Sequence, residues 1–268
     1  MKVASVQTDV ALGHTTWNVA QTIAEMERLA AEGVELAVFP ECCLTGYCVD
    51  SVEDARRIAL KANDASLQTV RAEADRFGIG VVIGFAERDG DDLYNSAAVF
   101  MPQETTQIYR KTHLPELGLD RFVKRGDKLD VIETKLCRLG ILICFDIRPP
   151  EAARTLALKG ADLLLVPTNW PEGAEVTADC IAPARASENK VWLISSNRVG
   201  VENGFHFIGH SKIVAPTGKP VAAAGNKETT LIADIDPAVA RVKRNIVIPG
   251  KYETEVFKSR RPDLYQLS

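Results

Sequence analysis

The sequence contains no long apolar run, no excess of basic charge, few histidines and no Cys-x-x-Cys pair. No stretch reaches the roughly 18 apolar residues that a membrane-spanning helix needs, and the first residues lack the apolar centre of a signal peptide. Lys and Arg number 32 and Asp and Glu number 36, and the basic residues do not cluster as they would along a phosphate backbone. We therefore expect no nucleic acid and no membrane as a partner, and a cytoplasmic location.

The six cysteines are spread through 268 residues that carry no secretory signal, so we interpret them as reduced thiols rather than as a disulfide framework. Their spacing is not that of zinc or iron–sulfur ligands. His206 and His210 are four residues apart in a strand-like segment, where such a spacing keeps the two rings far from each other. We expect no metal site.

Apolar strand-like runs alternate with helix-like segments in both halves of the chain, and strand-rich segments are inserted between them. This alternation predicts an α/β architecture with helices outside and sheets within. One helix should be capped by Thr15 or Thr16 and end at Gly33. The other expected helices are 53–62, 66–77, 151–159 and 178–189. The expected strands are 3–6, 36–39, 79–85, 94–101, 105–109, 141–143, 161–166, 191–195, 205–215 and 229–235.

Cys144 follows the apolar run Ile141–Ile143, which is typical of a strand buried on both faces of a covered parallel sheet. In open α/β sheets ligands bind at the carboxyl ends of strands, so a thiol at this position is a candidate nucleophile. A buried, inert cysteine is the alternative until partners for the thiol are identified.

Several polar residues also follow expected strands and should reach the same edge of a sheet. Glu41 and Lys111 each follow an apolar strand, and Asn169–Trp170 and Asn197–Arg198 follow two others. No histidine lies beside a motif shaped like the partner of a catalytic cysteine. Glu41 and Lys111 are therefore the better candidates for groups that activate Cys144, although either one alone could be a solvated surface residue.

Three segments together resemble the signature segments of the nitrilase superfamily of carbon–nitrogen hydrolases. They are Phe39-Pro-Glu41, Tyr109-Arg-Lys111-Thr-His-Leu-Pro and Cys144-Phe-Asp-Ile-Arg-Pro-Pro-Glu151, and the later segments 184–189, 196–200 and 209–218 are also similar to that family. The likeness covers nearly the whole chain. It implies a four-layer αββα sandwich with two central mixed sheets and helices outside, and a single catalytic domain over residues 1–268.

The resemblance also implies a role for each signature residue. Glu41 would be the general base, Cys144 the nucleophile, and Lys111 the cation that stabilises the developing oxyanion together with the backbone N–H of Phe145. The implied reaction is hydrolysis of a small amide, either an aliphatic amide or an N-carbamoyl compound. It proceeds through a thioester, releases ammonia or an amine, and needs no cofactor.

The family keeps a second acidic residue after the lysine, and here Asp120 fits its pattern best, with Glu116 as the rival. Phe145-Asp146 is similar to the amidase branch, since true nitrilases typically have tryptophan and glutamate there. The chain departs from the family at Pro149, where an aromatic residue is usual, and at Arg125-Gly126, where proline-glycine is common. We expect both departures to affect the choice of substrate rather than the reaction.

Tyr47, Arg148, Asn169 and Trp170 are the expected residues of the substrate pocket. Arg148 could bind a substrate carboxylate, as a hydrolase of carbamoyl amino acids requires, or form an ion pair with Glu151 one helical turn away. Trp170 could line the pocket or pack in the core.

Nitrile hydrolysis by the same three residues, and a non-enzymatic binding or assembly role for the fold, are alternatives to the amidase interpretation. A thiol protease or acyltransferase would need a histidine partner or an extended acceptor groove, and the sequence suggests neither. The resemblance also implies a homodimer or a higher homo-oligomer. The C-terminal tail, about residues 245–268, is expected to contact another subunit.

Overall fold

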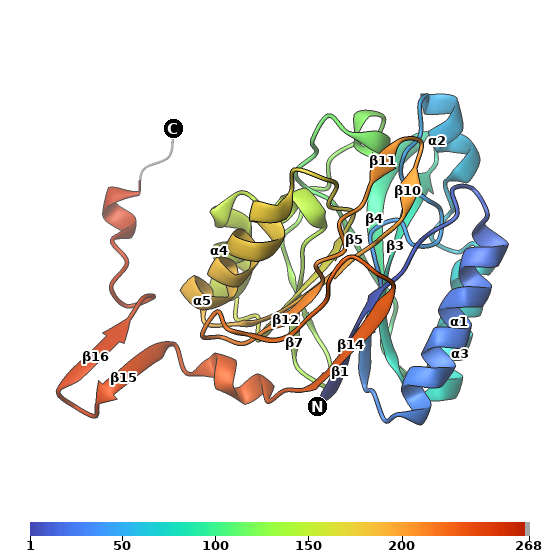
Figure 1. Ribbon diagram of the computed structural model, residues 1–268. Coiled ribbons are helices and arrows are strands. Elements are labelled where there is room, and N and C mark those ends of the chain that lie inside the picture. Colours follow the sequence, from blue (N-terminus) through green and yellow to red (C-terminus); the bar gives the residue numbers. More distant parts are fainter. Residues whose placement is uncertain (266–268) are drawn as a thin grey trace.

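The structure is a computed structural model that describes residues 1–265. Two six-stranded mixed sheets stack face to face, and helices cover their outer faces (Figure 1). This four-layer arrangement confirms the fold expected from the sequence. Part of the expected C-terminal contact segment, Gln266–Ser268, lies outside the described residues.

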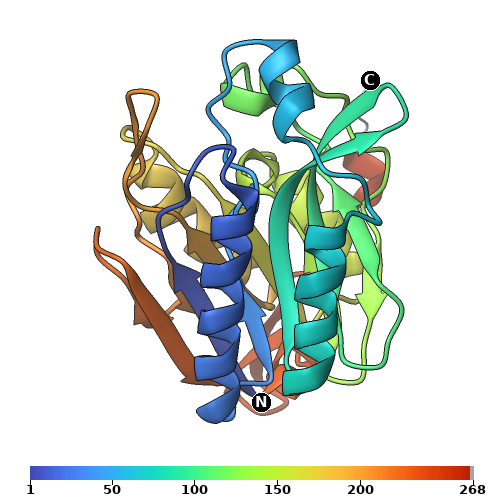
Figure 2. The ribbon, with the colours of Figure 1, turned by 90° about the vertical axis from the view of Figure 1, so that its right-hand side faces the viewer.

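The first sheet has the strand order β14-β1-β2-β3-β4-β5, in which β1, β2 and β3 are parallel and the other pairings are antiparallel. Helices α1 (Thr15–Ala31) and α3 (Ala65–Phe77) lie side by side on its outer face (Figure 2). The strands are β1 (Lys2–Gln7), β2 (Leu36–Val38), β3 (Gly80–Asp89), β4 (Asp92–Phe100), β5 (Gln107–Arg110) and β14 (Thr229–Asp234).

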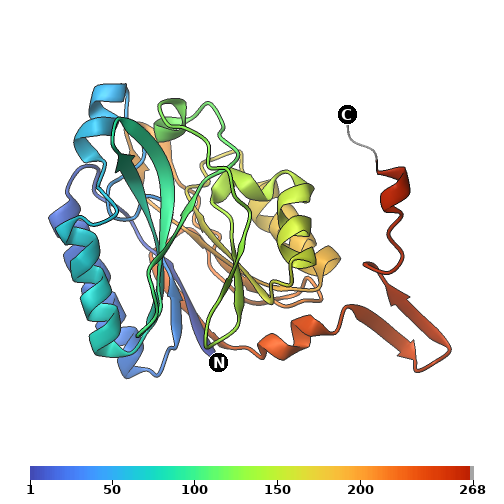
Figure 3. The same ribbon diagram turned by 180° about the vertical axis from the view of Figure 1, so that it is seen from behind.

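The second sheet has the order β13-β12-β9-β8-β7-β6, with β7, β8 and β9 parallel. Helices α4 (Pro150–Leu158) and α5 (Ala182–Asn189) cover its outer face (Figure 3). Its strands are β6 (Val131–Glu133), β7 (Arg138–Ile141), β8 (Leu163–Thr168), β9 (Trp192–Asn197), β12 (Lys212–Val214) and β13 (Pro220–Ala223).

A small buried hydrogen-bonded group joins the two sheets within a largely apolar core. Val38 of the first sheet and Ile194 of the second belong to one buried apolar cluster. Within it, the hydroxyl of Ser5 lies 2.8 Å from that of Ser196, and Ser196 donates to the Val38 carbonyl over 2.6 Å. All these groups are buried and paired, so the polar contact fixes how the sheets face each other without leaving a polar group unsatisfied.

Three sequence-based expectations about local structure were wrong. Neither Thr15 nor Thr16 caps α1, because His14 occupies the N-cap position and makes no side-chain cap. The helix expected over 53–62 is α2 (Val52–Ile58), and it ends early because Leu60 pairs with β3 at Glu87. The strand expected over 205–215 is divided into β11 (Phe205–His206), which pairs with β10 (Val201–Glu202), a loop, and β12.

The C-terminal segment leaves the sandwich and forms a separate hairpin, β15 (Arg244–Ile248) and β16 (Tyr252–Glu255), which projects from the body of the molecule (Figures 1 and 3). The sequence did not suggest strands there. No helix within residues 1–265 is long and apolar enough to cross a membrane. All six cysteines are free, and the described residues contain no group of three or more side chains that could hold a metal ion.

Candidate active site

Glu41, Lys111 and Asp120 meet in the interior, although they come from three separate segments. Glu41 follows β2, Lys111 follows β5, and Asp120 lies in a short 3-10 helix, Gly118–Arg121. Lys111 Nζ lies 2.8 Å from Glu41 Oε1 and 2.6 Å from Asp120 Oδ2. All three residues are buried. A buried ammonium that contacts two carboxylates is a costly arrangement, and such arrangements occur preferentially at functional sites.

The backbone that carries Glu41 lies directly on β3, and this packing requires Gly84. A Cβ atom at position 84 would lie 2.6 Å from Glu41 Cα and 2.3 Å from the backbone nitrogen of Cys42. Such distances are too short for any side chain, so glycine at this position permits the close approach. Cys42 itself has a φ of 49°, in the left-handed region that favours glycine.

Two further residues complete the buried cluster. Asn95 of β4 donates from Nδ2 to Glu41 Oε1 over 2.7 Å and to Asp120 Oδ1 over 2.8 Å. Tyr47 donates its hydroxyl to Asp120 Oδ2 over 2.9 Å. The sequence suggested Tyr47 as a residue of the substrate pocket, and it did not indicate that Asn95 contacts these carboxylates. The only signal for Asn95 was an amide in the middle of a strand whose later residues are apolar.

Asp120, rather than Glu116, is the acidic residue that reaches Lys111. Glu116 is exposed and lines a cavity of about 150 Å³ beside Arg121 and Cys48. Asp120 follows it by one turn of irregular chain, and its carboxylate is buried in the cluster. The position of Asp120 therefore supports the first of the two assignments made from the sequence.

Cys144 opens a 3-10 turn, Cys144–Ile147, immediately beyond the strand β7 and its buried extension. Its φ is 47°, which is unusual for a residue other than glycine, and its side chain is almost completely buried. Strained backbone of this kind is concentrated at functional sites, where the surrounding structure holds it in place. Cys144 therefore lies just beyond a strand, as expected, but in a strained turn. Contacts from other parts of the chain must hold this turn in place.

Asp146 supplies that support by joining the turn to the segment around Lys111. Its carboxylate accepts from the Ile143 N–H over 2.9 Å, from the Tyr109 hydroxyl over 2.8 Å and from the His113 N–H over 2.8 Å. Thr112 also donates its hydroxyl to Asp146, over 2.9 Å. One buried carboxylate therefore binds residues on both sides of Lys111 and the residue that precedes Cys144.

The charges of the cluster act on the Cys144 thiol. Burial and the negative charge of Glu41 raise the pKa of Cys144 to about 12, while Lys111, the Thr168 hydroxyl and the Asn169 N–H lower it in part. Burial also raises the pKa of Glu41, which Lys111 counteracts. Burial lowers the pKa of Lys111, but Asp120 and Glu41 more than offset this and hold it well above its usual value. At neutral pH the resting site therefore holds a protonated thiol beside a charged ammonium.

Among the other residues expected at the substrate site, some are buried and some are exposed. Asn169 and Trp170 follow β8 and are buried, and Trp170 belongs to the core cluster. Asn169 leaves both atoms of its side-chain amide without a partner among residues 1–265. Phe145 is 37% exposed. Arg148 is exposed and donates to the Thr177 hydroxyl over 2.8 Å, and it forms no ion pair with Glu151 in the described structure, so of the two alternatives for Arg148 the structural one was wrong.

Asn197 and Arg198 do not join the cluster. Asn197 accepts from the Trp170 N–H over 2.8 Å and so supports the loop after β8. Arg198 is fully buried between Glu202, at 2.8 Å, and Asp9, at 3.0 Å. Both residues therefore have structural contacts, and the polar residues expected at one edge are divided between the buried cluster around Lys111 and the ion pairs of Arg198.

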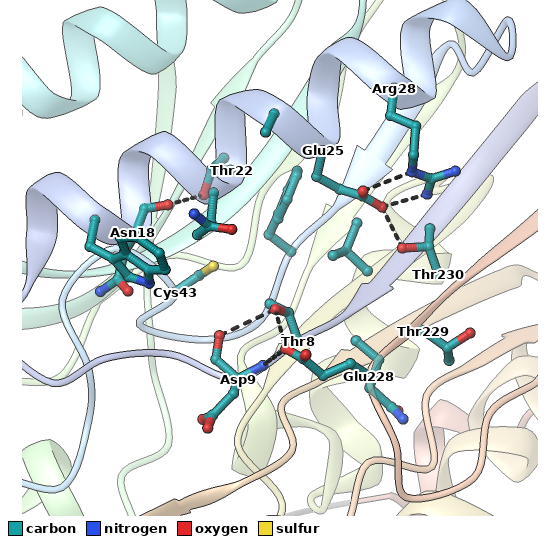
Figure 4. A pocket seen from close by; sticks show the side chains of 16 residues that line it. Thr8, Asp9, Asn18, Thr22, Glu25, Arg28, Cys43, Glu228, Thr229 and Thr230 are labelled. Atoms are coloured by element: carbon teal, nitrogen blue, oxygen red, sulfur yellow. Dashed lines mark hydrogen bonds and ion pairs between the residues drawn. The ribbon is translucent and has the colours of Figure 1, made fainter.

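A cavity of about 520 Å³ between α1 and the strands β1 and β14 is also separate from this cluster (Figure 4). Its wall includes Trp17, Cys43 and Glu228, and Glu25 pairs there with Arg28 and accepts from Thr230. It contains none of the candidate catalytic residues. Its carboxylates Glu25 and Glu228 already accept hydrogen bonds from Arg28 and Thr8, so they do not point to a reaction.

Known proteins are similar to this chain in both sequence and fold. The family model for carbon-nitrogen hydrolase matches residues 2–245. A protein named nitrilase from Pyrococcus abyssi is 35% identical over 268 residues, which cover 99% of each chain. The crystal structure of Saccharomyces cerevisiae Nit3, a member of branch 10 of the nitrilase superfamily, has a TM-score of 0.82 and 29% identity, and the match covers 90% of this chain and 92% of that one.

A further structure that this chain resembles carries a modified active site. A mutant of the amidase from Nesterenkonia sp. AN1 has a TM-score of 0.82 and 25% identity, with 98% of this chain and 95% of that chain covered. It shows covalent addition of the acetamide moiety of fluoroacetamide at its active-site cysteine. By sequence and by fold, this chain is an enzyme that belongs to the carbon–nitrogen hydrolase family of the nitrilase superfamily.

Proposed function

We propose that this enzyme hydrolyses the C–N bond of a small amide, either an aliphatic amide or an N-carbamoyl compound, through a thioester on Cys144. The observation that carries the proposal is the buried contact between Lys111 and Glu41, 2.8 Å apart, whose charges both affect the pKa of the Cys144 thiol. A thiol with a pKa of about 12 is almost entirely protonated at neutral pH, so attack on a carbonyl requires a base beside it.

Glu41 is the base in this proposal. Its Oε1 atom accepts from Lys111, whereas Oε2 is buried and has no partner within residues 1–265. Oε2 takes the thiol proton as the sulfur attacks the amide carbon, and gives it to the nitrogen as the C–N bond breaks. His113 is a weaker candidate, because its ring already contacts Asp146, 2.8 Å away.

Lys111 and the backbone N–H of Phe145 stabilise the negative oxygen of the tetrahedral intermediate. Ammonia or an amine leaves, and Glu41 then removes a proton from the water that attacks the thioester. The carboxylic acid is released and the Cys144 thiol is restored. Each catalytic cycle therefore consumes one amide and one water and yields one acid and one ammonia or amine. Glu41 passes the thiol proton to the leaving nitrogen and returns the water proton to the sulfur, so the protons balance.

Amides and nitriles can be distinguished directly. We expect the wild-type enzyme to release ammonia from aliphatic amides or carbamoyl amino acids faster than from nitriles with the same side chain, because Phe145-Asp146 resembles the amidase branch. The measurement is ammonia release across matched pairs of amides and nitriles. Release from nitriles alone would show that the substrate class proposed here is wrong, and would favour the alternative activity.

We further propose that residues 1–268 form one catalytic domain that associates into a homodimer, or a higher homo-oligomer, through the C-terminal tail. The tail exposes apolar side chains on the projecting hairpin and beyond it, and monomeric proteins rarely leave such patches uncovered. A cavity of about 900 Å³ separates its last described part from α4 and α5. The exposed side chains are Ile246, Val247, Ile248, Tyr252, Val256, Leu264 and Tyr265.

Removal of residues 244–268 should therefore lower the mass of the particle in solution to that of one chain. The reason is that the deletion removes the apolar surface that would be buried between subunits. Light scattering after size-exclusion chromatography measures the mass, and Cys144→Ala is the control, because it leaves the tail intact. An unchanged mass for the truncated chain would place the subunit contact elsewhere.

A further inference from the structure

Within residues 1–265, Asn95 is the one neutral side chain that contacts both carboxylates of the buried cluster through a single nitrogen. Its Nδ2 donates to Glu41 Oε1 over 2.7 Å and to Asp120 Oδ1 over 2.8 Å. Its Oδ1 accepts a weak bond from the Cys42 thiol, at 3.6 Å, and its backbone carbonyl accepts from the Lys111 N–H over 2.8 Å. Every polar group of Asn95 except its backbone N–H is therefore directed at the segments that carry the catalytic cluster.

Two groups connect the carboxylates of Glu41 and Asp120, one charged and one neutral. Lys111 Nζ joins Glu41 Oε1 to Asp120 Oδ2 with a charged group, and Asn95 Nδ2 joins Glu41 Oε1 to Asp120 Oδ1 with a neutral one. Glu41 Oε1 thus accepts two hydrogen bonds, while Oε2 accepts none within residues 1–265. With one oxygen held from two sides, the carboxylate cannot rotate to exchange its two oxygens without breaking both bonds.

We propose that Asn95 is a positioning residue for the reaction: by holding Glu41 Oε1, it fixes Oε2 as the atom that exchanges protons with the Cys144 thiol and the leaving nitrogen. This inference rests on the proposed role of Glu41 as the base. Asn95 acts through Glu41 and need not touch the substrate. It also keeps Asp120 beside Lys111, so that a single ammonium serves both carboxylates.

Only an amide of this length suits the position. A serine has one donor, a glutamine places its nitrogen one methylene further out, and an aspartate would add a third acidic group beside Glu41 and Asp120. A cationic side chain would compete with Lys111 for the same oxygens. Asn95 supplies two N–H groups from one nitrogen without changing the charge of the cluster, and it is completely buried.

The role of Asn95 should be visible in the pH dependence of kcat/KM, because the groups around Glu41 set its pKa. Burial and Asp120 raise the pKa of Glu41, while Lys111 and the hydrogen bond from Asn95 lower it. Loss of the Asn95 bond should therefore raise this pKa further. Since the base must be deprotonated to act, the acidic limb of the kcat/KM profile should move to higher pH. The ionisable side chains whose charges act together around Glu41 are Cys42, Tyr47, Cys48, Lys111, Asp120 and Cys144.

The test compares Asn95→Leu, which keeps the branched shape and the number of side-chain heavy atoms but has no donor, with Asn95→Ser, which keeps one donor, and with Ser96→Ala as the matched control. Ser96 is the next residue of β4, is equally buried, and donates to the Glu87 carboxylate, which also binds Arg110. We expect Asn95→Leu to lower kcat about 100-fold with little change in KM, and to shift the acidic limb upward. Asn95→Ser should be intermediate and Ser96→Ala close to wild type.

Alkylation of Cys144 by iodoacetamide separates this inference from the proposed function, because it needs no knowledge of the substrate. The pH profile of its rate, followed by mass spectrometry, should move to higher pH in Asn95→Leu and by a smaller amount in Asn95→Ser. Unchanged alkylation and turnover profiles in both variants would overturn the positioning role while leaving the amidase proposal intact. A shifted alkylation profile in an enzyme that hydrolyses no amide would support the role and refute the amidase proposal. If Asn95→Leu does not fold, Asn95→Ser alone decides the outcome.

Discussion

Replacement of Cys144 with alanine should lower kcat for ammonia release by about four orders of magnitude or more, without loss of the fold. Removal of a nucleophile abolishes the covalent pathway, and the remaining groups can only assist direct attack by water. Alanine removes only the sulfur atom from a buried side chain, so the neighbouring Asp146 contacts that hold the turn are retained. The measurement is steady-state ammonia release with a circular dichroism spectrum as the check on folding.

Cys180 is the matched control for this prediction. It is the exposed cysteine of the six, so it reacts with alkylating reagents irrespective of catalysis, whereas Cys144 is buried beside Lys111. Cys180→Ala should therefore remove one labelled thiol and leave turnover at the wild-type level. A Cys144→Ala variant that retains its rate would eliminate the thioester mechanism.

Replacement of Lys111 with methionine should have the second-largest effect, and it should reduce both activity and stability. Methionine has a similar length but no charge, so Glu41 and Asp120 would face each other without the ammonium that now lies 2.8 Å and 2.6 Å away. Breaking a buried ion pair by removal of one partner typically costs about 3–5 kcal/mol of the free energy of unfolding. Loss of the oxyanion-stabilising charge should lower kcat by about two to three orders of magnitude.

The stability loss of Lys111→Met should depend on pH in a defined direction. Without Lys111, the pKa of Glu41 in the folded protein rises further above its unfolded value, so the folded state binds a proton that the unfolded state releases. Stability must then fall as pH increases through this range. Denaturant unfolding at about pH 5 and about pH 8 should show the larger deficit at the higher pH.

A second substitution separates charge from shape. Adding Glu41→Gln to Lys111→Met removes one of the two opposed carboxylates, so the double variant should regain stability but not activity. Lys124→Met is the control, because Lys124 pairs with Asp92 at the surface and should change unfolding little. A double variant no more stable than Lys111→Met would contradict the account of opposed charges.

The candidate catalytic residues could be selected from the sequence where a strand led directly to a polar residue. Glu41, Lys111 and Cys144 each follow a buried run, as expected, but the single sheet edge expected for them was wrong. Glu41 and Lys111 follow β2 and β5 of the first sheet, and Cys144 follows β7 of the second, so the site is assembled from both sheets. Asp120 was less certain, because the segment from Lys111 to Asp127 has no periodicity, and only a short 3-10 helix places its carboxylate beside Lys111. The contacts of Asn95 could not be predicted, because an amide within a strand does not reveal which buried groups lie opposite it.

The elements of the fold were predictable more fully than their arrangement. Periodicity located most strands and the helices α1, α3, α4 and α5, but sheet order depends on contacts between segments far apart in the chain, such as β14 with β1. The early end of α2 arose from one such contact, the bridge between Leu60 and Glu87. The division of the strand expected over 205–215 likewise depends on the pairing of β11 with β10, a contact that periodicity alone does not indicate.

The contacts of Asp146 have a consequence for how this site can vary. Because one carboxylate joins the turn of Cys144 to Tyr109, Thr112 and His113, the position of Cys144 relative to Lys111 depends on local hydrogen bonds as well as on the spacing of the two sheets. Substitutions in the surrounding loops that leave these Asp146 contacts intact should therefore alter the choice of substrate more than the reaction.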